Sequence, residues 1–151
     1  MRTSGEPTEL SFGHTPDADD AFMLYALTAE KVCSTKLRIK HIIKPIQALN
    51  LDAINGVHDI SAISLGAFPF VSHLYDLLPC GACMGFKYGP MLLSRQPLSK
   101  SQLRATTIAI PGKMTTAYLA LRLYDPDLKI VELKFDAIPD AITSGFLPTP
   151  I

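Results

Sequence analysis

The sequence lacks several features that would assign it to a common class of protein. Its 14 Lys and Arg residues balance its 14 Asp and Glu residues, so the formal net charge is zero. Nucleic-acid-binding domains usually carry a basic excess or a basic patch, so this balance argues against a nucleic-acid partner. No run of like charges indicates a membrane surface, and no stretch approaches the roughly 18 apolar residues of a membrane span.

Targeting, disulfide and nucleotide-binding signals are missing as well. The first ten residues, MRTSGEPTEL, contain no apolar region of a secretory signal, which favours a cytoplasmic protein. The 3 Cys are an odd count, which does not indicate a disulfide framework. The chain contains neither G-x-x-x-x-G-K-[ST] nor G-x-G-x-x-G, the two glycine-rich motifs that bind nucleotide phosphates.

Cys80 and Cys83 form a C-x-x-C pair, which can be a redox motif or half of a zinc site. A redox pair normally opens a helix, and this one lies in extended, apolar sequence. A structural zinc site needs a second pair, and only Cys33 remains. We therefore expect buried, inert thiols and no metal site.

The sequence does contain the alternating elements of an α/β protein with parallel strands. Apolar residues make up 48% of the 151 residues and charged residues 19%, as in a folded globular chain. The patterns predict strands over 10–13, 36–44, 60–65, 106–110 and 130–135, with further extended segments over 77–84 and 88–95. They predict a buried helix over 21–27 and helices over 46–54, 67–75, 115–124 and 136–143, with 94–105 as a connection. Ligands bind beyond the carboxyl ends of parallel strands, so the loops at 13–20, 64–69 and 111–116 are the candidate site.

The first of these loops, GHTPDADDAF at residues 13–22, is rich in acidic residues. Asp17, Asp19 or Asp20 could cap the following helix and suit its dipole with no further function. A ligand-contacting loop is the alternative, and His14, Thr15 and Asp17 are best placed to face a ligand. An EF-hand is excluded because no Gly or distal Glu has the required spacing.

The last of these loops, PGKMTTAY at residues 111–118, has the pattern of an anion pocket. A strand, Pro-Gly and then two hydroxyl residues opening a helix would offer free backbone N–H groups, the helix dipole and the side chains of Thr115 and Thr116. A carboxylate or a phosphate would fit, although Thr115 could be a helix cap alone. His41, His58 and His73 are scattered, and we expect structural or surface roles for them.

Several stretches together resemble a known family. LNLDAINGVHDISAISLGAF and YGPMLLSR are similar to the helix–strand unit and the lobe crossover of type II periplasmic-binding-protein folds. FMLYAL, IAIPGKMTTAYLALRLY and FDAIPDAITSG resemble the futalosine branch of menaquinone biosynthesis, and within it the 1,4-dihydroxy-6-naphthoate synthase family. The resemblance covers roughly residues 10–145, and PGKMTTAY is its most specific part.

The resemblance implies an α/β, Venus-flytrap fold with the substrate between two lobes. Residues 1–95 would form most of lobe one and residues 96–151 the first part of lobe two. The implied enzyme is a carbon–carbon lyase that cleaves cyclic dehypoxanthinyl futalosine, a small-molecule carboxylate, without a metal or organic cofactor. Chorismate dehydratase of the same pathway and a non-enzymatic solute-binding protein are the alternatives. Residue by residue, the resemblance implies a substrate pocket formed by His14, Thr15, Asp17, Asn50, Ser64, Thr115 and Thr116.

The sequence departs from the family pattern in two places. The first loop of the family usually reads S-P-C-P-N-D-T-F, whereas this loop is longer and contains His14. In the family, an acidic-Ala-Gly strand and a His-Glu pair follow the segment that matches 136–144, and that His is the proposed general base. Here FLPTPI follows Gly145, so we expect an inactive fragment, with His14 as the only loop histidine at a strand end.

Overall fold

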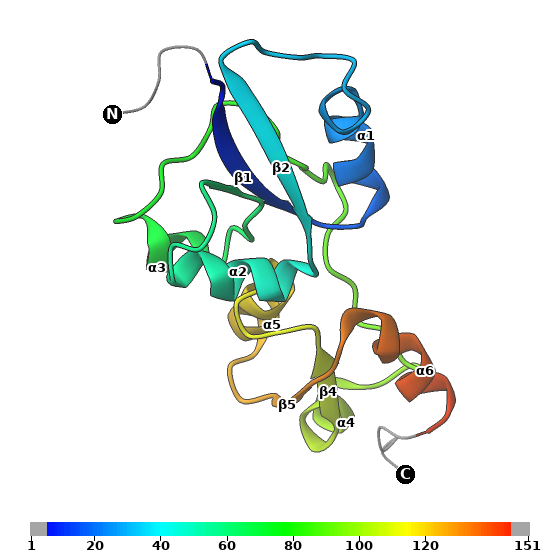
Figure 1. The fold of residues 1–151 in the computed structure, drawn as a ribbon. Helices are drawn as coiled ribbons and strands as arrows, with labels where there is room; N and C mark the ends of the chain where they lie inside the picture. The colour runs from blue at the N-terminus through cyan, green and yellow to red at the C-terminus, as the bar shows by residue number, and fades with distance from the viewer. Residues whose placement is uncertain (1–5, 146–151) are drawn as a thin grey trace. The chain divides into compact units, whose positions relative to one another are not determined.

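The computed structural model describes residues 6–145. The chain divides into two compact units, residues 1–84 and residues 85–151, whereas the sequence analysis placed the boundary after residue 95. Figure 1 shows that each unit has its own sheet and helices. Both sheets are parallel, which confirms the α/β class predicted from the alternating elements.

The first unit is built on a three-stranded sheet with the strand order β2-β1-β3. Its strands are β1 (Thr8–His14), β2 (Leu37–Ile43) and β3 (Ile60–Ser61). The register pairs Phe12 with His41 on one side and with Ile60 on the other. Because all three strands run in the same direction, their carboxyl ends meet at one edge, where the candidate loops begin.

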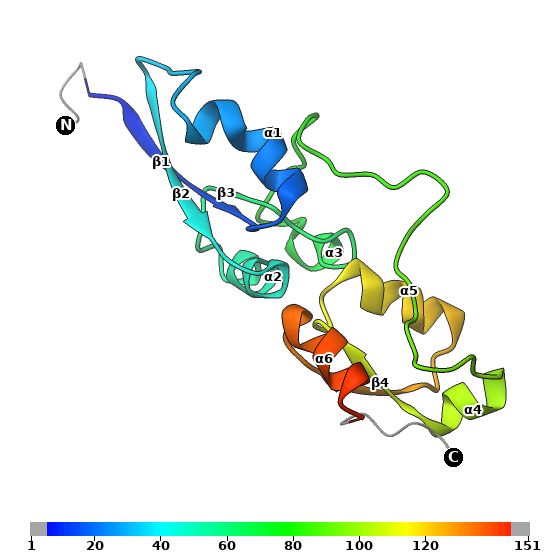
Figure 2. The same cartoon turned by 90° about the vertical axis from the view of Figure 1, so that its right-hand side faces the viewer.

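The helices of the first unit are α1 (Ala18–Thr28), α2 (Ile46–Ile54) and the short α3 (Phe68–Val71). Helices α1 and α2 lie on opposite faces of the sheet in Figure 2, as right-handed crossovers from β1 to β2 and back to β3 require. The α2 face is closely packed. A Cβ atom at Gly13 would lie 2.7 Å from Leu49 Cδ2 and 3.1 Å from His58 Cδ2, so glycine is needed there for α2 to approach the sheet.

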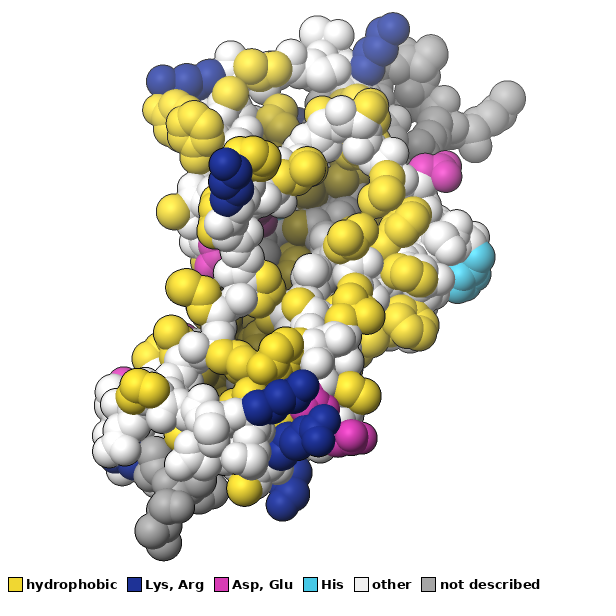
Figure 3. Space-filling view, turned by 180° about the vertical axis from the view of Figure 1, so that it is seen from behind, with side chains coloured by type: hydrophobic (Ala, Val, Ile, Leu, Met, Phe, Trp, Pro, Cys, Tyr) yellow, Lys and Arg dark blue, Asp and Glu magenta, His cyan; other side chains and the backbone are white. Residues whose placement is uncertain are grey.

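The buried apolar residues of this unit come from α2 and the segment around α3, namely Leu49, Ala53, Ala67 and Val71. The prediction of a buried helix over residues 21–27 is wrong, since α1 has no buried residue and Phe22 is 85% exposed. A helix that is apolar all round is buried only where further elements cover it. Within residues 6–145, no helix or strand packs densely against α1. Figure 3 shows hydrophobic side chains spread over the visible face of each unit.

The second unit contains a two-stranded sheet of β4 (Thr107–Ile110) and β5 (Lys129–Glu132). Its helical segments are α4 (Lys100–Ala105), α5 (Thr116–Tyr124), the 3₁₀ turn η1 (Phe135–Ala137) and α6 (Ile138–Thr143). Ile110, Leu121 and Leu128 form its core, so β4, α5 and the turn before β5 pack together. The predicted helices over 115–124 and 136–143 are confirmed.

The segment between the sheets differs from the sequence prediction. Residues 75–99 form neither helix nor strand, although 77–84 and 88–95 were predicted to be extended. The expectation of buried thiols at Cys80 and Cys83 is wrong, because both residues are exposed, as is Cys33. Helix α4 was missed, although Ser99 and Gln102 form a reciprocal capping box that marks its start.

Candidate functional site

The loop after β1 is held in place by one acidic side chain. Asp20 Oδ2 accepts hydrogen bonds from the Thr15 backbone N–H at 2.7 Å and from the Thr15 hydroxyl at 2.9 Å. The Thr15 hydroxyl oxygen also accepts from the Asp17 backbone N–H at 3.3 Å. These hydrogen bonds hold Thr15 at the carboxyl end of β1, where it is buried.

The acidic residues of this loop therefore have different roles. Asp17 is the N-cap residue of α1, yet its side chain makes no capping hydrogen bond, and the side chain is exposed. Asp20 binds Thr15 instead of capping the helix. The Asp19 carboxylate accepts a hydrogen bond from the Cys83 thiol, which lowers the pKa of Asp19 and raises the pKa of Cys83.

Two histidines meet at the same end of the sheet. His14, the last residue of β1, is 4% exposed, and its Nε2 lies 3.2 Å from Nδ1 of His41 on β2. His14 Nδ1 lies 3.2 Å from the carbonyl oxygen of Thr15. The Phe12 ring stacks on His41 and meets His14 edge-on. Burial, and secondly the positive charge of His14, lower the pKa of His41 below its usual value.

The second pair of expected site residues is Asn50 and Ser64. Asn50 is fully buried on α2. Its Oδ1 accepts from the Ser64 backbone N–H at 2.9 Å, and its Nδ2 donates to the Ser64 hydroxyl at 3.0 Å. The pair fixes the loop that follows β3 to α2, so its clearest role in the structure is to shape this edge of the sheet.

A further polar cluster lies around Asp52 of α2. Asp52 Oδ2 contacts Lys44 Nζ at 2.7 Å and His58 Nε2 at 2.9 Å. The Lys44 hydrogen bond comes first among the causes that lower the pKa of Asp52, and the His58 hydrogen bond adds to it. Tyr75 donates from its hydroxyl to the His58 carbonyl oxygen at 2.6 Å. His58 is therefore a structural residue, as the sequence analysis expected.

In the second unit, Thr115 and Thr116 stand at the start of α5, as predicted. Thr115 is the N-cap, and its hydroxyl donates to the Gly112 carbonyl oxygen at 2.7 Å and accepts from the Tyr118 N–H at 3.3 Å. The side chain is 4% exposed, so its hydroxyl is used by the local backbone. The structure thus shows that Thr115 caps α5. Thr116 is half-buried in the first turn of the helix.

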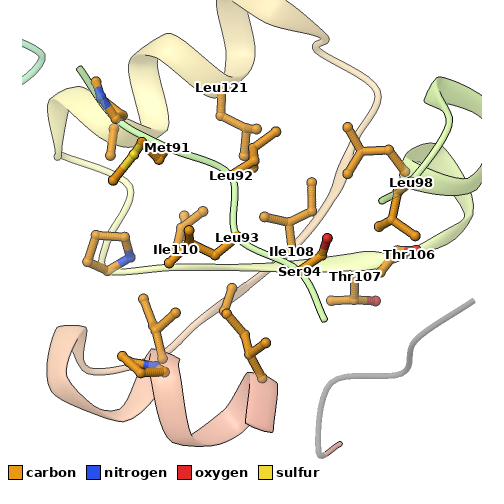
Figure 4. A pocket seen from close by; sticks show the side chains of 18 of the residues that line it. Met91, Leu92, Leu93, Ser94, Leu98, Thr106, Thr107, Ile108, Ile110 and Leu121 are labelled. Carbon is orange, nitrogen blue, oxygen red and sulfur yellow. The ribbon is translucent and has the colours of Figure 1, made fainter. Parts of the chain in front are cut away.

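The second unit also contains a cavity of about 910 Å³. Figure 4 shows side chains of Leu92 and Leu93 meeting Ile108 of β4 and Leu121 of α5. The lining is mostly apolar and contains neither Thr115 nor Thr116. Its volume is in the range of ligand pockets, about 300–1,000 Å³, yet it includes no histidine. Its ionisable lining residues are Arg95, Tyr124 and Asp136, so the cavity offers mainly apolar contact beside these three polar groups.

The structure brings some of the expected residues together and separates others by unit. His14 ends β1, and Thr15 and Asp17 follow it in the next loop. Asn50 and Ser64 bind each other, and Thr115 and Thr116 belong to the second unit. Sequence reasoning missed His41 and Asp20 as members of the first site. The alternation of Leu37, Ile39 and His41 along β2 contains the signal, since it places His41 on the same face as Phe12 and His14 once β1 and β2 pair in parallel.

Two further observations concern the whole described chain. Within residues 6–145, no three His, Cys, Asp or Glu side chains gather in a way that could hold a metal ion. No helix in this range has the length and apolar character needed to cross a membrane.

Comparison with known proteins places these features in a family. A family model described as menaquinone biosynthesis matches residues 10–148. The 1,4-dihydroxy-6-naphthoate synthase of Thermus thermophilus is 30% identical over 136 residues, and that of Streptomyces coelicolor is 30% identical over 142 residues; each match covers 90% of this chain and 49% of the relative.

A crystal structure of a protein from Archaeoglobus fulgidus is also similar, with a TM-score of 0.86 and 38% identity. The match covers 92% of this chain and 51% of that one. The chain thus spans about half the length of the curated relatives it matches. Since the family model covers most of the sequence, the chain belongs to the menaquinone biosynthesis family.

Proposed function

We propose that this chain supplies one half of an enzyme that cleaves cyclic dehypoxanthinyl futalosine to release 1,4-dihydroxy-6-naphthoate. The observation that supports this proposal most strongly is the match to two 1,4-dihydroxy-6-naphthoate synthases over 90% of the chain. Both relatives are enzymes, and both are about twice as long as the matched segment. The substrate and the reaction therefore apply to the longer protein.

The fold proposed for that protein is the type II periplasmic-binding-protein fold. Two α/β units with parallel sheets agree with this proposal. The carboxyl edge of the β2-β1-β3 sheet is where such a fold contacts ligands. We propose His14, Thr15 and Asp17 as substrate contacts there.

Asn50 and Ser64 are proposed to contribute at the same edge. Because their side chains bind each other, their main contribution is to hold the loop after β3. In the second unit, we propose that the start of α5 binds a carboxylate of the substrate. The Thr115 hydroxyl binds backbone partners. We propose that the N-terminal backbone of the helix makes the contact, beside Thr116, which the family resemblance also assigns to the pocket.

The proposed reaction is a carbon–carbon lyase reaction that begins with removal of a proton next to a carbonyl group. Such a step needs an unprotonated base within hydrogen-bond reach of the proton, about 2.6–3.2 Å. In the described first unit, the pair of His14 and His41 provides imidazole groups at the ligand edge. Neither the substrate nor the reaction requires a metal ion in this proposal.

The test is a chimera in which residues 10–145 replace the matched half of the Thermus thermophilus synthase. We expect the chimera to release 1,4-dihydroxy-6-naphthoate from cyclic dehypoxanthinyl futalosine, measured by liquid chromatography. The 151-residue chain by itself should show no turnover. Circular dichroism establishes that both proteins are folded.

Other outcomes would select the alternative functions. A folded chimera that consumes chorismate but not cyclic dehypoxanthinyl futalosine would identify a dehydratase. Binding of either compound, measured by calorimetry, without turnover of either would favour a solute-binding protein. Full turnover by the 151-residue chain alone would contradict the proposal that it is one half of the enzyme.

A further inference from the structure

The two units share one chain path through their sheets. In each unit a first strand, a helix, a second parallel strand and a second helix follow one another. These are β1, α1, β2 and α2 in the first unit and β4, α5, β5 and α6 in the second. In the first unit a third strand, β3, then follows α2 and pairs with the other edge of β1. Within residues 6–145, the second unit has no strand in the corresponding place.

The correspondence between β1 and β4 extends to single hydrogen bonds. The carbonyl oxygen of His14, the last residue of β1, accepts from the Lys44 N–H just after β2 at 3.1 Å. The carbonyl oxygen of Ile110, the last residue of β4, accepts from the Leu133 N–H just after β5 at 3.0 Å. Successive residues of a strand direct their backbone groups to opposite edges, so the residue before each of these two faces the other edge.

In β1 the residue that faces the other edge is Gly13, and its carbonyl oxygen accepts from the Ala62 N–H beyond β3 at 2.8 Å. In β4 the corresponding residue is Ala109, whose N–H and carbonyl groups therefore face away from β5. Thr107, two residues earlier, faces the same way. No strand of the described chain pairs with this side of β4, which we call the free edge.

The helices of the second unit show where a third strand would lie. Figure 4 shows α5, which carries Leu121, and the last helix, α6, on opposite sides of β4. Crossovers between parallel strands are right-handed. Since α5 leads from β4 to β5 along one face, a crossover through α6 on the opposite face leads back to the free edge of β4. Helix α2 makes the same step from β2 to β3 in the first unit.

The cavity of about 910 Å³ extends along this edge. Its lining includes all residues of 106–111, although a strand presents only alternate side chains to each face. The cavity is therefore open to the edge of β4 as well as to a face. A strand as long as β4, of 4 residues, fills on the order of 600 Å³, from a strand spacing of about 4.8 Å, a layer spacing of about 10 Å and a rise of about 3.3 Å per residue. The cavity is large enough for such a strand.

The composition of the two strands agrees with this placement. Strand β4 reads TIAI and has no charged residue, whereas β5 reads KIVE, with Lys129 and Glu132 exposed. Charged residues are typical of strands at the edge of a sheet, and uncharged, apolar sequences are typical of inner parallel strands. Strand β2, the outer strand of the first unit, likewise carries Arg38 and Lys40. The pattern fits β5 as an outer strand and β4 as an inner one.

We propose that the free edge of β4 binds a third parallel strand, supplied by the half of the enzyme that lies outside the matched segment. This strand pairs through its backbone with Thr107 and Ala109, and its apolar side chains fill the cavity. The inference rests on the proposed function, in which this chain is one half of a longer protein, and it states where the other half joins. The relatives support this source of the strand, because each match covers only 49% or 51% of the relative.

The test uses the part of the Thermus thermophilus synthase that follows its matched segment, expressed as a separate chain. This fragment is refolded together with the ¹⁵N-labelled 151-residue chain, and amide hydrogen exchange is followed by NMR. We expect exchange of the Thr107 and Ala109 N–H groups to slow by at least about tenfold in the complex, and that of the Ile108 N–H, which faces β5, to change less. A mixture without a complex by size-exclusion chromatography, or a complex without slowing at Ala109, would overturn the proposal.

Two proline replacements separate strand addition from general destabilisation. Ala109→Pro removes an N–H that faces the free edge, and proline is tolerated where the N–H side of a strand is unpaired. The 151-residue chain should therefore stay folded by circular dichroism, while its affinity for the fragment falls by at least about tenfold. Ile108→Pro removes an N–H that faces β5 and should destabilise the chain itself. Equal damage by the two replacements would mean that the Ala109 N–H already has a partner within the chain, contrary to the proposal.

The same spectra identify other occupants of the free edge. If Ala109 is protected in the 151-residue chain alone and loses this protection when residues 146–151 are deleted, those residues occupy the edge and the proposal fails. Protection of Ala109 that rises with the concentration of the chain alone would identify a second copy and would also contradict it.

The synthase chimera distinguishes this proposal from the proposed function. An inactive chimera in which the Ala109 N–H exchanges slowly would contradict the function and support the strand site. An active chimera in which the Ala109 N–H exchanges as fast as in the 151-residue chain would support the function and overturn the strand site.

Discussion

The Asn50 amide binds Ser64 at both of its polar ends and so fastens helix α2 to the loop that follows β3. Its Oδ1 accepts from the Ser64 N–H at 2.9 Å, and its Nδ2 donates to the Ser64 hydroxyl at 3.0 Å. Asn50 is completely buried. A buried polar group that loses its partner keeps the cost of its desolvation, so this pair matters more to the fold than an exposed pair would.

Replacing Asn50 with Ala should therefore destabilise the chain by about 2–4 kcal/mol, from lost hydrogen bonds and a small cavity. Ser64→Ala keeps the Ser64 backbone N–H bonded to Asn50 Oδ1 and should cost about 1 kcal/mol. Urea unfolding followed by circular dichroism measures both values. An Asn50→Ala variant as stable as Ser64→Ala would show that the backbone N–H bond contributes little.

The helices and strands could be predicted where the sequence pattern of a segment also determines its contacts in the fold. The start of α5 follows from the Pro-Gly and Thr-Thr sequence, and the structure places the N-cap at Thr115. The burial of α1 could not be predicted, because an apolar composition shows what a helix can bury and not whether a second layer covers it. The prediction that Cys80 and Cys83 are buried was wrong for the same reason. Apolar neighbours in the sequence do not show whether a segment joins a sheet, and both thiols are exposed.

The location of the candidate site could be predicted from the sequence, but only some of its residues could. Parallel strands direct attention to the loop after β1, and His14 and Thr15 are found there. His41 lies 27 residues later in the sequence than His14, and their contact depends on the register of β1 and β2. The alternation along each strand indicates which residues share a face, and it places His41 beside His14 only once the pairing of β1 with β2 is known. The bond from Thr15 to Asp20 also depends on how the loop closes.

The Thr115 hydroxyl is expected to stabilise the start of α5. In Thr115→Val, the Tyr118 N–H loses the hydroxyl acceptor and the Gly112 carbonyl keeps only the Thr115 N–H as a donor. The expected cost is about 1–3 kcal/mol. Thr115→Ser keeps the hydroxyl and loses one methyl group, so its cost should be below about 1 kcal/mol. Urea unfolding distinguishes the two variants, and equal losses would mean that packing rather than capping matters at this position.

The thiol of Cys83 should react more slowly than an unperturbed thiol. Its hydrogen bond to the Asp19 carboxylate raises the pKa of Cys83, which lowers the fraction of reactive thiolate at pH 8. Asp19→Asn should therefore speed alkylation of Cys83 by iodoacetamide, as followed by peptide mass spectrometry. Cys33 is an exposed internal reference.

Asp17→Asn is the matched control for that experiment. Asp17 lies in the same loop, and its carboxylate is not among the groups that raise the pKa of Cys83. The control should leave the alkylation rate of Cys83 unchanged. Equal acceleration by both replacements would attribute the effect to the general negative charge of the loop.

The ion pair of Arg104 and Asp125 should make stability depend on pH in the acid range. Arg104 Nε donates to Asp125 Oδ2 at 2.6 Å, and this bond lowers the pKa of Asp125 in the folded chain. The Asp125 side chain is 1% exposed. A carboxyl group with a depressed folded pKa stabilises the protein above its unfolded pKa, about 3.9, and that stability is lost as pH falls through the folded value.

Asp125→Asn should consequently be less stable than the parent chain at pH 7 and at pH 5, with the difference shrinking below about pH 4. Urea unfolding midpoints at pH 7, 5, 4 and 3 measure this change. Glu132→Gln is the control, because its ion pair with Lys113 is 3.4 Å long and both side chains are largely exposed, so little effect is expected. A stability difference for Asp125→Asn that stays constant down to pH 3 would show that the residue acts through its hydrogen-bond geometry and not through its charge.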